Sequence, residues 1–224
     1  MYKKVEVVCK AFGLVAFFIL MQYSIMALFK IGIELKGVPF QSYYETHLYL
    51  INGTIQASYL FILLIVDKLK KEDLKQVFGL MVSQKWISYI GYGIGLWMLS
   101  TLLNAFLLPF FEEYGTHISQ LFANNERVLR FINLIILAPF VEEYLFRYKI
   151  QEVLKKGFGP TLAIIFQGVL FGLIHAIALQ KIYAIVLGIG LGFIREKEKH
   201  LQSSIIAHMT INSIGFLVGT FLIS

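Results

Sequence analysis

Several features that would point to a soluble or secreted protein are scarce in this sequence of 224 residues. Only 15% of the residues are charged, against about a quarter in ordinary soluble domains. The single cysteine, Cys9, has no partner for an internal disulfide and excludes a cysteine-based metal site. No polar linker or segment is long enough to hold a separate soluble domain. These absences exclude a disulfide-stabilised fold and argue against a soluble one.

Long uncharged runs are what the sequence has instead. Five of them are long enough, at roughly 20 residues each, to cross about 30 Å of hydrocarbon as helices. Residues 131–150, apolar up to Glu142, and the short glycine-rich run 182–194 are weaker candidates. Because a chain in lipid must satisfy its own amides, and these runs are too long for barrel strands, we predict an all-α polytopic transmembrane bundle. About seven helices are expected, within a range of about six to eight. The five clear runs are residues 11–29, 46–66, 86–111, 157–180 and 201–224.

The net charge of +6 comes from lysine and arginine in the connections between these segments, and we expect no nucleic-acid partner. Successive connections alternate between many and few basic residues, with 15 on one side and 5 on the other. Since basic connections stay in the cytoplasm, we predict a cytoplasmic N-terminus and a C-terminus outside. The whole chain, 1–224, is predicted as a single multi-pass domain in the lipid bilayer of a bacterial plasma membrane.

Ionisable residues inside a membrane are costly, and in this chain they gather in the C-terminal half. The first cluster is Glu142-Glu143 followed by Arg147. On a helix, Glu143 faces Arg147 four residues on, whereas Glu142 points about 100° away. The second cluster is His175 within an uncharged run, and the third is the pair His208 and Asn212, which share a helix face.

Each cluster taken alone has a structural explanation. The Glu-Arg pair fits a helix end that emerges into water, and His175 fits a hydrogen-bonded histidine that only supports the fold. His208 and Asn212 fit a polar contact between helices. Together, the clusters supply an inventory that suits hydrolysis. A carboxylate and an imidazole can hold and deprotonate a water, while a second imidazole and an amide can donate to a developing oxyanion.

The three motifs, in this order, resemble those of a known family. They resemble the CPBP (CAAX protease and bacteriocin-processing, or Abi) family of intramembrane glutamic endopeptidases, whose best-known branch is the type II CAAX prenyl endopeptidase. The resemblance covers residues 131–220, the expected catalytic core, whereas the helices of residues 1–110 carry no motif. In this chain the motifs read Glu142-Glu143-Tyr144-Leu145-Phe146-Arg147, Phe171-Gly172-Leu173-Ile174-His175 and His208-Met209-Thr210-Ile211-Asn212.

The resemblance implies a role for each matching residue. Glu142 would be the general base that activates a water with help from His175, and His208 with Asn212 would stabilise the oxyanion. The residues that would position this set are Glu143, Arg147 and Phe171. No cofactor is expected. Zinc held by Glu142, His175 and His208 stays open as an alternative, because two histidines and a glutamate are suitable ligands.

On this basis we predict an endopeptidase that cuts a membrane-associated peptide or protein. The settings usual for the family are bacteriocin or signal-peptide maturation and bacteriocin self-immunity. A catalytically inactive scaffold or regulator with the same fold is an alternative, and so is a proton-coupled transporter, although the chain shows no internal repeat. Glu112-Glu113-Tyr114 repeats the Glu-Glu-Tyr string at the end of an apolar run, and we expect it to be solvated and non-catalytic.

One difficulty concerns depth in the membrane. The helical rise puts His175 about 24 Å beyond Gly159, but His208 only about 10 Å beyond the start of its own segment. For the two histidines to meet, the helices must be tilted or broken around a water-filled cavity, or the fifth must begin below the membrane plane.

Overall fold

The computed structural model describes residues 2–72, 85–111, 113–123 and 126–223. Within these residues every regular element is a helix, which confirms the predicted all-α bundle. Among the helices of these described ranges, five are long and apolar enough to cross a membrane. They are α1 (Tyr2–Glu34), α3 (Leu48–Leu69), α5 (Trp86–Leu107, extended by η1, Leu108–Phe110), α10 (Ala178–Glu198) and α11 (Leu201–Ile223).

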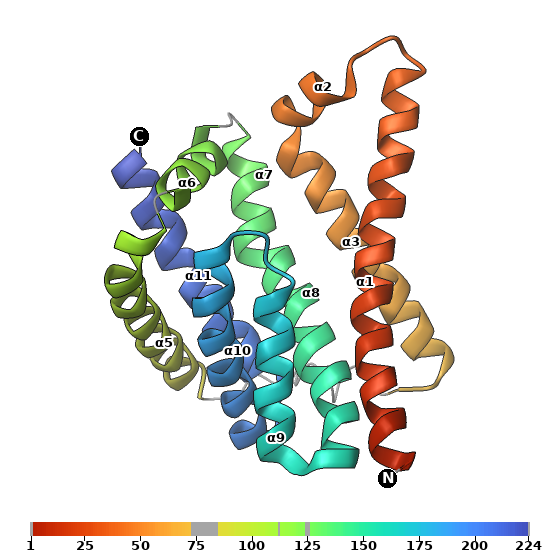
Figure 1. Ribbon diagram of the computed structural model, residues 1–224, viewed down its shortest axis with the longest axis vertical. Coiled ribbons are helices and arrows are strands. Elements are labelled where there is room, and N and C mark those ends of the chain that lie inside the picture. Colours follow the sequence, from red (N-terminus) through yellow and green to blue (C-terminus); the bar gives the residue numbers. More distant parts are fainter. Residues whose placement is uncertain (1, 73–84, 112, 124–125, 224) are drawn as a thin grey trace.

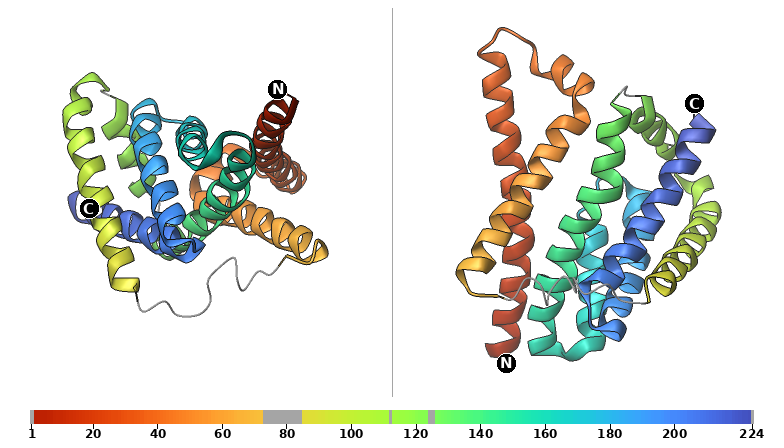
Figure 2. Two further views of the ribbon diagram at one scale, coloured as in Figure 1. Left: turned by 90° about the horizontal axis from the view of Figure 1, so that it is seen from below. Right: turned by 180° about the vertical axis from the view of Figure 1, so that it is seen from behind.

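A further crossing is a continuous rod of short pieces that runs down the middle of the molecule (Figures 1 and 2). It begins at Arg127, earlier than the predicted residue 131, and Pro139 lies inside it. Two pieces are π-helical, and they flank the Glu142-Glu143 pair. The rod consists of α7 (Arg127–Phe131), the π-helix η2 (Ile132–Leu137), α8 (Ala138–Glu143), the π-helix η3 (Tyr144–Ile150) and the first part of α9 (Gln151–Leu173).

The rod ends at Gly159, whose φ of 77° lies in the left-handed region that favours glycine. Pro160 then opens the second part of α9, as the sequence predicts. With these two pieces, the described residues form seven membrane-directed rods, in line with the predicted number. An odd number of crossings puts the two termini at opposite ends of the bundle, where Figure 1 shows them. The short helices α2 (Phe40–Thr46) and α6 (Glu113–Ala123) lie at the end that carries the C-terminus (Figure 1).

The predicted single segment 157–180 is wrong in one respect that matters for the site. After Pro160 the helix ends at Leu173, a length of roughly 21 Å that falls short of the ~30 Å hydrocarbon core. A non-helical turn over residues 174–177 follows, and α10 runs back down beside α9. Figure 1 shows this hairpin turning at mid-height, well below the upper ends of α1 and α7. His175 therefore lies in a turn at mid-depth rather than inside a helix.

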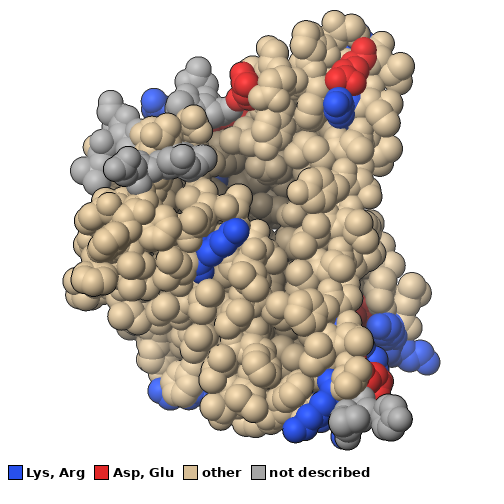
Figure 3. Space-filling model, viewed as in Figure 1, with Lys and Arg blue, Asp and Glu red and all other residues tan. Residues whose placement is uncertain are grey.

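A non-helical backbone at this depth must be satisfied by protein or must line a water-filled space. His175 N donates to Gly172 O at 3.1 Å, whereas Leu173 and Ala176 are exposed. The space-filling view is hollowed above mid-height, between the upper lobes of the molecule (Figure 3). The hairpin therefore ends partway across the bundle, and His175 and His208 meet on either side of the Phe171 ring.

Glycines allow the two arms of this hairpin to pack closely. A Cβ on Gly168 would lie 2.8 Å from the backbone N of Ile189, and one on Gly172 would lie 2.6 Å from the carbonyl oxygen of Lys181. Facing them, a Cβ on Gly188 would lie 2.9 Å from Gly168 Cα. Such small residues let helix backbones approach in a membrane. The hairpin position, and with it that of His175, therefore depends on these glycines.

This packing predicts that Gly168→Ala destabilises the protein, whereas Gly95→Ala does not. A Cβ at Gly168 meets backbone atoms that cannot yield, while a Cβ at Gly95 on α5 meets nothing within 4 Å. Overpacking of this kind costs about 1–3 kcal/mol. Unfolding of the purified variants in detergent, followed by circular dichroism, gives the comparison. Equal stability of the two variants would contradict the close approach of α9 and α10.

Candidate active site

The centre of the molecule holds a fully buried ion pair. Arg147 Nη1 lies 3.0 Å from Glu143 Oε1, and both side chains are 0% exposed. The two residues face each other one helical turn apart, as their spacing predicts. Arg147 also donates from Nη2 to Gly188 O at 3.3 Å, and its guanidinium lies 4.4 Å from the centre of the Phe171 ring. The pair is therefore not part of a helix end that emerges into water, and that explanation of the cluster is wrong.

His208 lies between the two adjacent glutamates. Its Nδ1 is 2.8 Å from Glu143 Oε1, and its Nε2 is 3.7 Å from Glu142 Oε2. Because a carboxylate only accepts hydrogen bonds, Nδ1 carries the proton toward Glu143. The glutamates diverge, as predicted, and reach opposite nitrogens of one imidazole. Glu143 is buried, whereas the side chain of Glu142 keeps 21% of its surface exposed, so Glu142 is the carboxylate that a water or a substrate can reach.

His175 approaches the same place from the turn between α9 and α10. Its Nδ1 lies 2.8 Å from the carbonyl oxygen of Phe171. Since a carbonyl oxygen accepts, Nδ1 is the donor, and Nε2 of the neutral ring is left with a free lone pair. The Phe171 ring meets the rings of His175 and His208 edge-on, with centroid distances of 5.0 and 6.0 Å. Phe171 thus separates the two imidazoles and positions both of them.

Asn212 has a structural contact that the sequence does not reveal. Its Nδ2 donates to Leu134 O at 2.7 Å. In the π-helix η2 a carbonyl pairs with the N–H five residues on, and for Leu134 that residue is Pro139, which has no N–H. The Asn212 amide therefore satisfies a carbonyl that the proline leaves without a donor. A second amide hydrogen remains on Asn212, since the side chain carries two.

The structure thus brings all the predicted site residues to one region, from α8, η3, α9 with its following turn, and α11. Contacts alone do not test their catalytic roles. Among the described residues, no hydrogen bond or ion pair joins Glu142 directly to His175. Within the same part of the chain, no group of three or more His, Cys, Asp or Glu side chains is arranged to hold a metal ion. His175 and His208 each use Nδ1 for a hydrogen bond, to Phe171 O and to Glu143 Oε1, as metal-bound histidines also do, so zinc at Glu142, His175 and His208 stays an untested alternative.

Two buried polar groups near the site were missed by the sequence reasoning. Asp67, at the end of α3, is 1% exposed and lies 2.5 Å from Lys149 Nζ, while Tyr144 donates a hydrogen bond to its other oxygen. Gln167 on α9 donates to Gly188 O at 2.7 Å, the carbonyl that Arg147 also contacts. For Gln167 the sequence held a signal, because a glutamine in the middle of an uncharged apolar run needs a polar partner. For Asp67 the sequence held no signal of burial, because this residue follows an apolar run and looks like the start of a solvated loop.

The fold and the site together define a class of protein: a polytopic helical membrane protein with one buried cluster of acidic and imidazole side chains at mid-depth. Residues 124–214 match the family model described as type II CAAX prenyl endopeptidase Rce1-like, a branch of the CPBP family. The match covers the part of the chain that carries the three motifs, and the likeness to this family supports protease activity. No curated protein and no solved structure matches the chain.

The buried ion pair predicts that Arg147→Met is strongly destabilising. The substitution leaves Glu143 as a buried charge without its cation, at a cost of about 3–5 kcal/mol. Adding Glu143→Gln removes that charge and should recover part of the loss. Thermal unfolding of the single and double variants in the same detergent measures both effects. A double variant less stable than Arg147→Met would contradict the pairing.

The Asn212 contact predicts energetic coupling to Pro139. Asn212→Leu leaves the Leu134 carbonyl unsatisfied, which costs about 1–3 kcal/mol. In a Pro139→Ala background, residue 139 regains an N–H that can serve this carbonyl, so the same substitution should cost less. A double-mutant cycle on unfolding free energies gives the coupling, expected at about 0.5 kcal/mol or more. Additive effects would show that Asn212 does not serve the proline-freed carbonyl.

Proposed function

We propose that this protein is an intramembrane endopeptidase that hydrolyses a peptide bond of a membrane-associated peptide or protein. The observation that carries the proposal is the convergence of an accessible carboxylate, Glu142, with two imidazoles around the ring of Phe171. The broken hairpin supports it, because a mid-depth turn requires protein or water around its backbone, and hydrolysis needs water. The family match over residues 124–214 is consistent with this activity.

In the proposed reaction, Glu142 accepts a proton from a water that also donates a hydrogen bond to Nε2 of His175. The water oxygen attacks the peptide carbonyl carbon, and negative charge develops on the carbonyl oxygen. Nε2–H of a protonated His208 and the second amide hydrogen of Asn212 donate to that oxygen. The C–N bond then breaks, and Glu142 returns its proton to the leaving amine. The products are a carboxylate and an amine.

Glu143, Arg147 and Phe171 act in this scheme by positioning. Glu143 orients His208 through Nδ1, as a carboxylate does for an imidazole in many active sites. Arg147 fixes Glu143, and Phe171 contacts the Arg147 guanidinium and both imidazole rings. None of these three side chains touches the attacking water. Replacing any of them should therefore weaken catalysis only through the positions of the residues that do.

The topology that we propose follows from the charge pattern, and the setting follows from the resemblance to the CPBP family. We place the lysine-rich end of the bundle, where the N-terminus lies, in the bacterial cytoplasm. The C-terminus then lies outside the plasma membrane. Maturation of a bacteriocin or signal peptide, or self-immunity to a bacteriocin, is the setting we propose. The reaction as proposed uses no metal, so a chelator such as 1,10-phenanthroline should leave the activity unchanged.

The proposal predicts that Glu142→Gln and His175→Ala abolish hydrolysis while the protein stays folded. The assay uses the purified full-length protein in liposomes with internally quenched peptides, with and without an S-farnesyl cysteine near the C-terminus. Loss of a general base lowers rates by typically about 10²–10⁴-fold. Fluorescence release gives the rate, and circular dichroism checks the fold.

Glu34→Gln is the matched control, because Glu34 is an exposed glutamate at the end of α1, far from the site residues in sequence. We expect wild-type rates for this variant. Equal rates in all three variants would show that Glu142 and His175 are not catalytic and would favour the scaffold alternative. Glu112, the first glutamate of the repeated Glu-Glu-Tyr string, lies outside the described residues. We expect Glu112→Ala to keep wild-type rates as well.

A further inference from the structure

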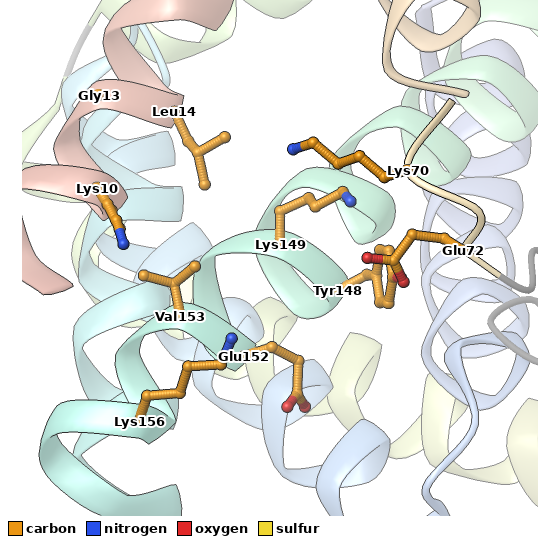
Figure 4. Close-up of a pocket in the computed structure, with 10 residues that line it drawn as sticks. All are labelled: Lys10, Gly13, Leu14, Lys70, Glu72, Tyr148, Lys149, Glu152, Val153 and Lys156. Carbon is orange, nitrogen blue, oxygen red and sulfur yellow. The ribbon is translucent and has the colours of Figure 1, made fainter. Parts of the chain in front are cut away.

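A polar pocket lies at the end of the bundle that carries the N-terminus, and none of its lining residues belongs to the Glu142 site. It has a volume of about 590 Å³ and opens between α1, the end of α3 and the start of α9. Binding pockets for small molecules usually measure about 300–1,000 Å³. Figure 4 shows the side chains that enclose it: Lys10, Gly13, Leu14, Lys70, Glu72, Tyr148, Lys149, Glu152, Val153 and Lys156.

Four lysines from three segments of the chain line this pocket, against two glutamates. Both glutamates already have partners. Glu152 lies 2.6 Å from Arg195 and 3.1 Å from Lys155, neither of which lines the pocket, and Glu72 accepts a hydrogen bond from Tyr148 at 2.6 Å. Cations outside the pocket therefore neutralise Glu152, whereas Glu72 keeps its negative charge, because a hydrogen bond from a tyrosine does not remove it.

The lysines differ in how far they are neutralised. Lys149 is paired with the buried Asp67, and Lys10 is paired with Glu6 on its own helix at 2.5 Å. Among the described residues, no ion pair or side-chain hydrogen bond involves Lys70 or Lys156. Figure 4 shows Lys70 extending across the pocket toward α1, from the side opposite Lys10. Two ammonium groups thus border a concave site without a carboxylate of their own.

The other walls are apolar. Leu14 and Val153 line the pocket, and a Cβ on Gly13 would meet nothing within 4 Å, so there is open space beside α1 at this height. Beyond it, α1 continues with exposed apolar side chains such as Phe17 and Leu20. A ligand with a negative head group and apolar chains matches this gradient from lysine to hydrocarbon.

From these observations we infer that the pocket binds the phosphate head group of an anionic phospholipid. Basic pockets between transmembrane helices are known sites for such head groups. A free phosphate shares the charge but not the chains, and it would make no use of the apolar wall formed by Leu14 and Val153. A lipid bound here would bridge α1, α3 and α9, because the lining lysines come from all three helix ends.

The test is native mass spectrometry of the purified full-length protein titrated with phosphatidylglycerol, phosphatidylcholine or inorganic phosphate. We expect phosphatidylglycerol to be retained in preference to the other two. A lysine near a membrane surface contributes about a factor of five to anionic lipid binding, so Lys70→Gln with Lys156→Gln should weaken retention roughly thirty-fold. The matched control is Lys30→Gln with Lys36→Gln, two exposed lysines at the opposite end, for which no change is expected.

A second variant tests the shape of the pocket independently of its charge. Gly13→Leu places a side chain in the open space and should lower phosphatidylglycerol retention while all four lysines remain. Equal loss in the Lys30 and Lys36 control would show that only the overall charge matters and would overturn the site. Tighter retention of inorganic phosphate than of phosphatidylglycerol would overturn the lipid assignment. Retention unchanged in both pocket variants would overturn the proposal as a whole.

Discussion

The arrangement of the catalytic half depends on the buried pair of Glu143 and Arg147. Two charges at 0% exposure are stable in a membrane protein only when each is compensated, and here the compensation comes from other helices. His208 of α11 meets Glu143, while Gly188 of α10 and the ring of Phe171 of α9 meet Arg147. One ion pair on the central rod thus specifies where three further helices lie. The partly exposed neighbour, Glu142, lies on the same rod but takes no part in this ion pair.

Departures from regular helix geometry place the remaining groups. The π-helical segments η2 and η3 flank the glutamates, and such segments often occur at functional sites because they redirect side chains. Pro139 has no N–H to donate to the Leu134 carbonyl, and the Asn212 amide donates to that carbonyl instead. This hydrogen bond connects α11 to the rod. The turn after α9 stops His175 at mid-depth. Such irregularities leave backbone groups that need a partner, and for the Leu134 carbonyl that partner is a predicted site residue, Asn212.

Much of this organisation was readable in the sequence. Uncharged runs identified four of the five long spans, whereas the fifth, α10, contains the weak candidate 182–194. The i, i+4 spacing predicted the contact of Glu143 with Arg147, and the polar inventory predicted a shared site. The sequence did not reveal that α9 ends at Leu173, because the apolar run continues through the turn into α10. Nor did it reveal the Asn212 contact, since a π-helical register has no composition signal of its own. The burial of Asp67 depends on Lys149 and Tyr144, 82 and 77 residues away, and local pattern carries no information about such partners.

The central claim is that Glu142 and His175 act on one water, with Nε2 of His175 as the free nitrogen. Nitrogen-15 NMR of histidine-labelled protein in lipid tests it most directly, because the chemical shifts distinguish the two ring nitrogens. The account predicts a His175 protonated at Nδ1, with an Nε2 resonance that moves when Glu142 is replaced by Gln and stays in place in Glu34→Gln. A His175 protonated at Nε2 alone, or an Nε2 resonance indifferent to Glu142, would contradict it.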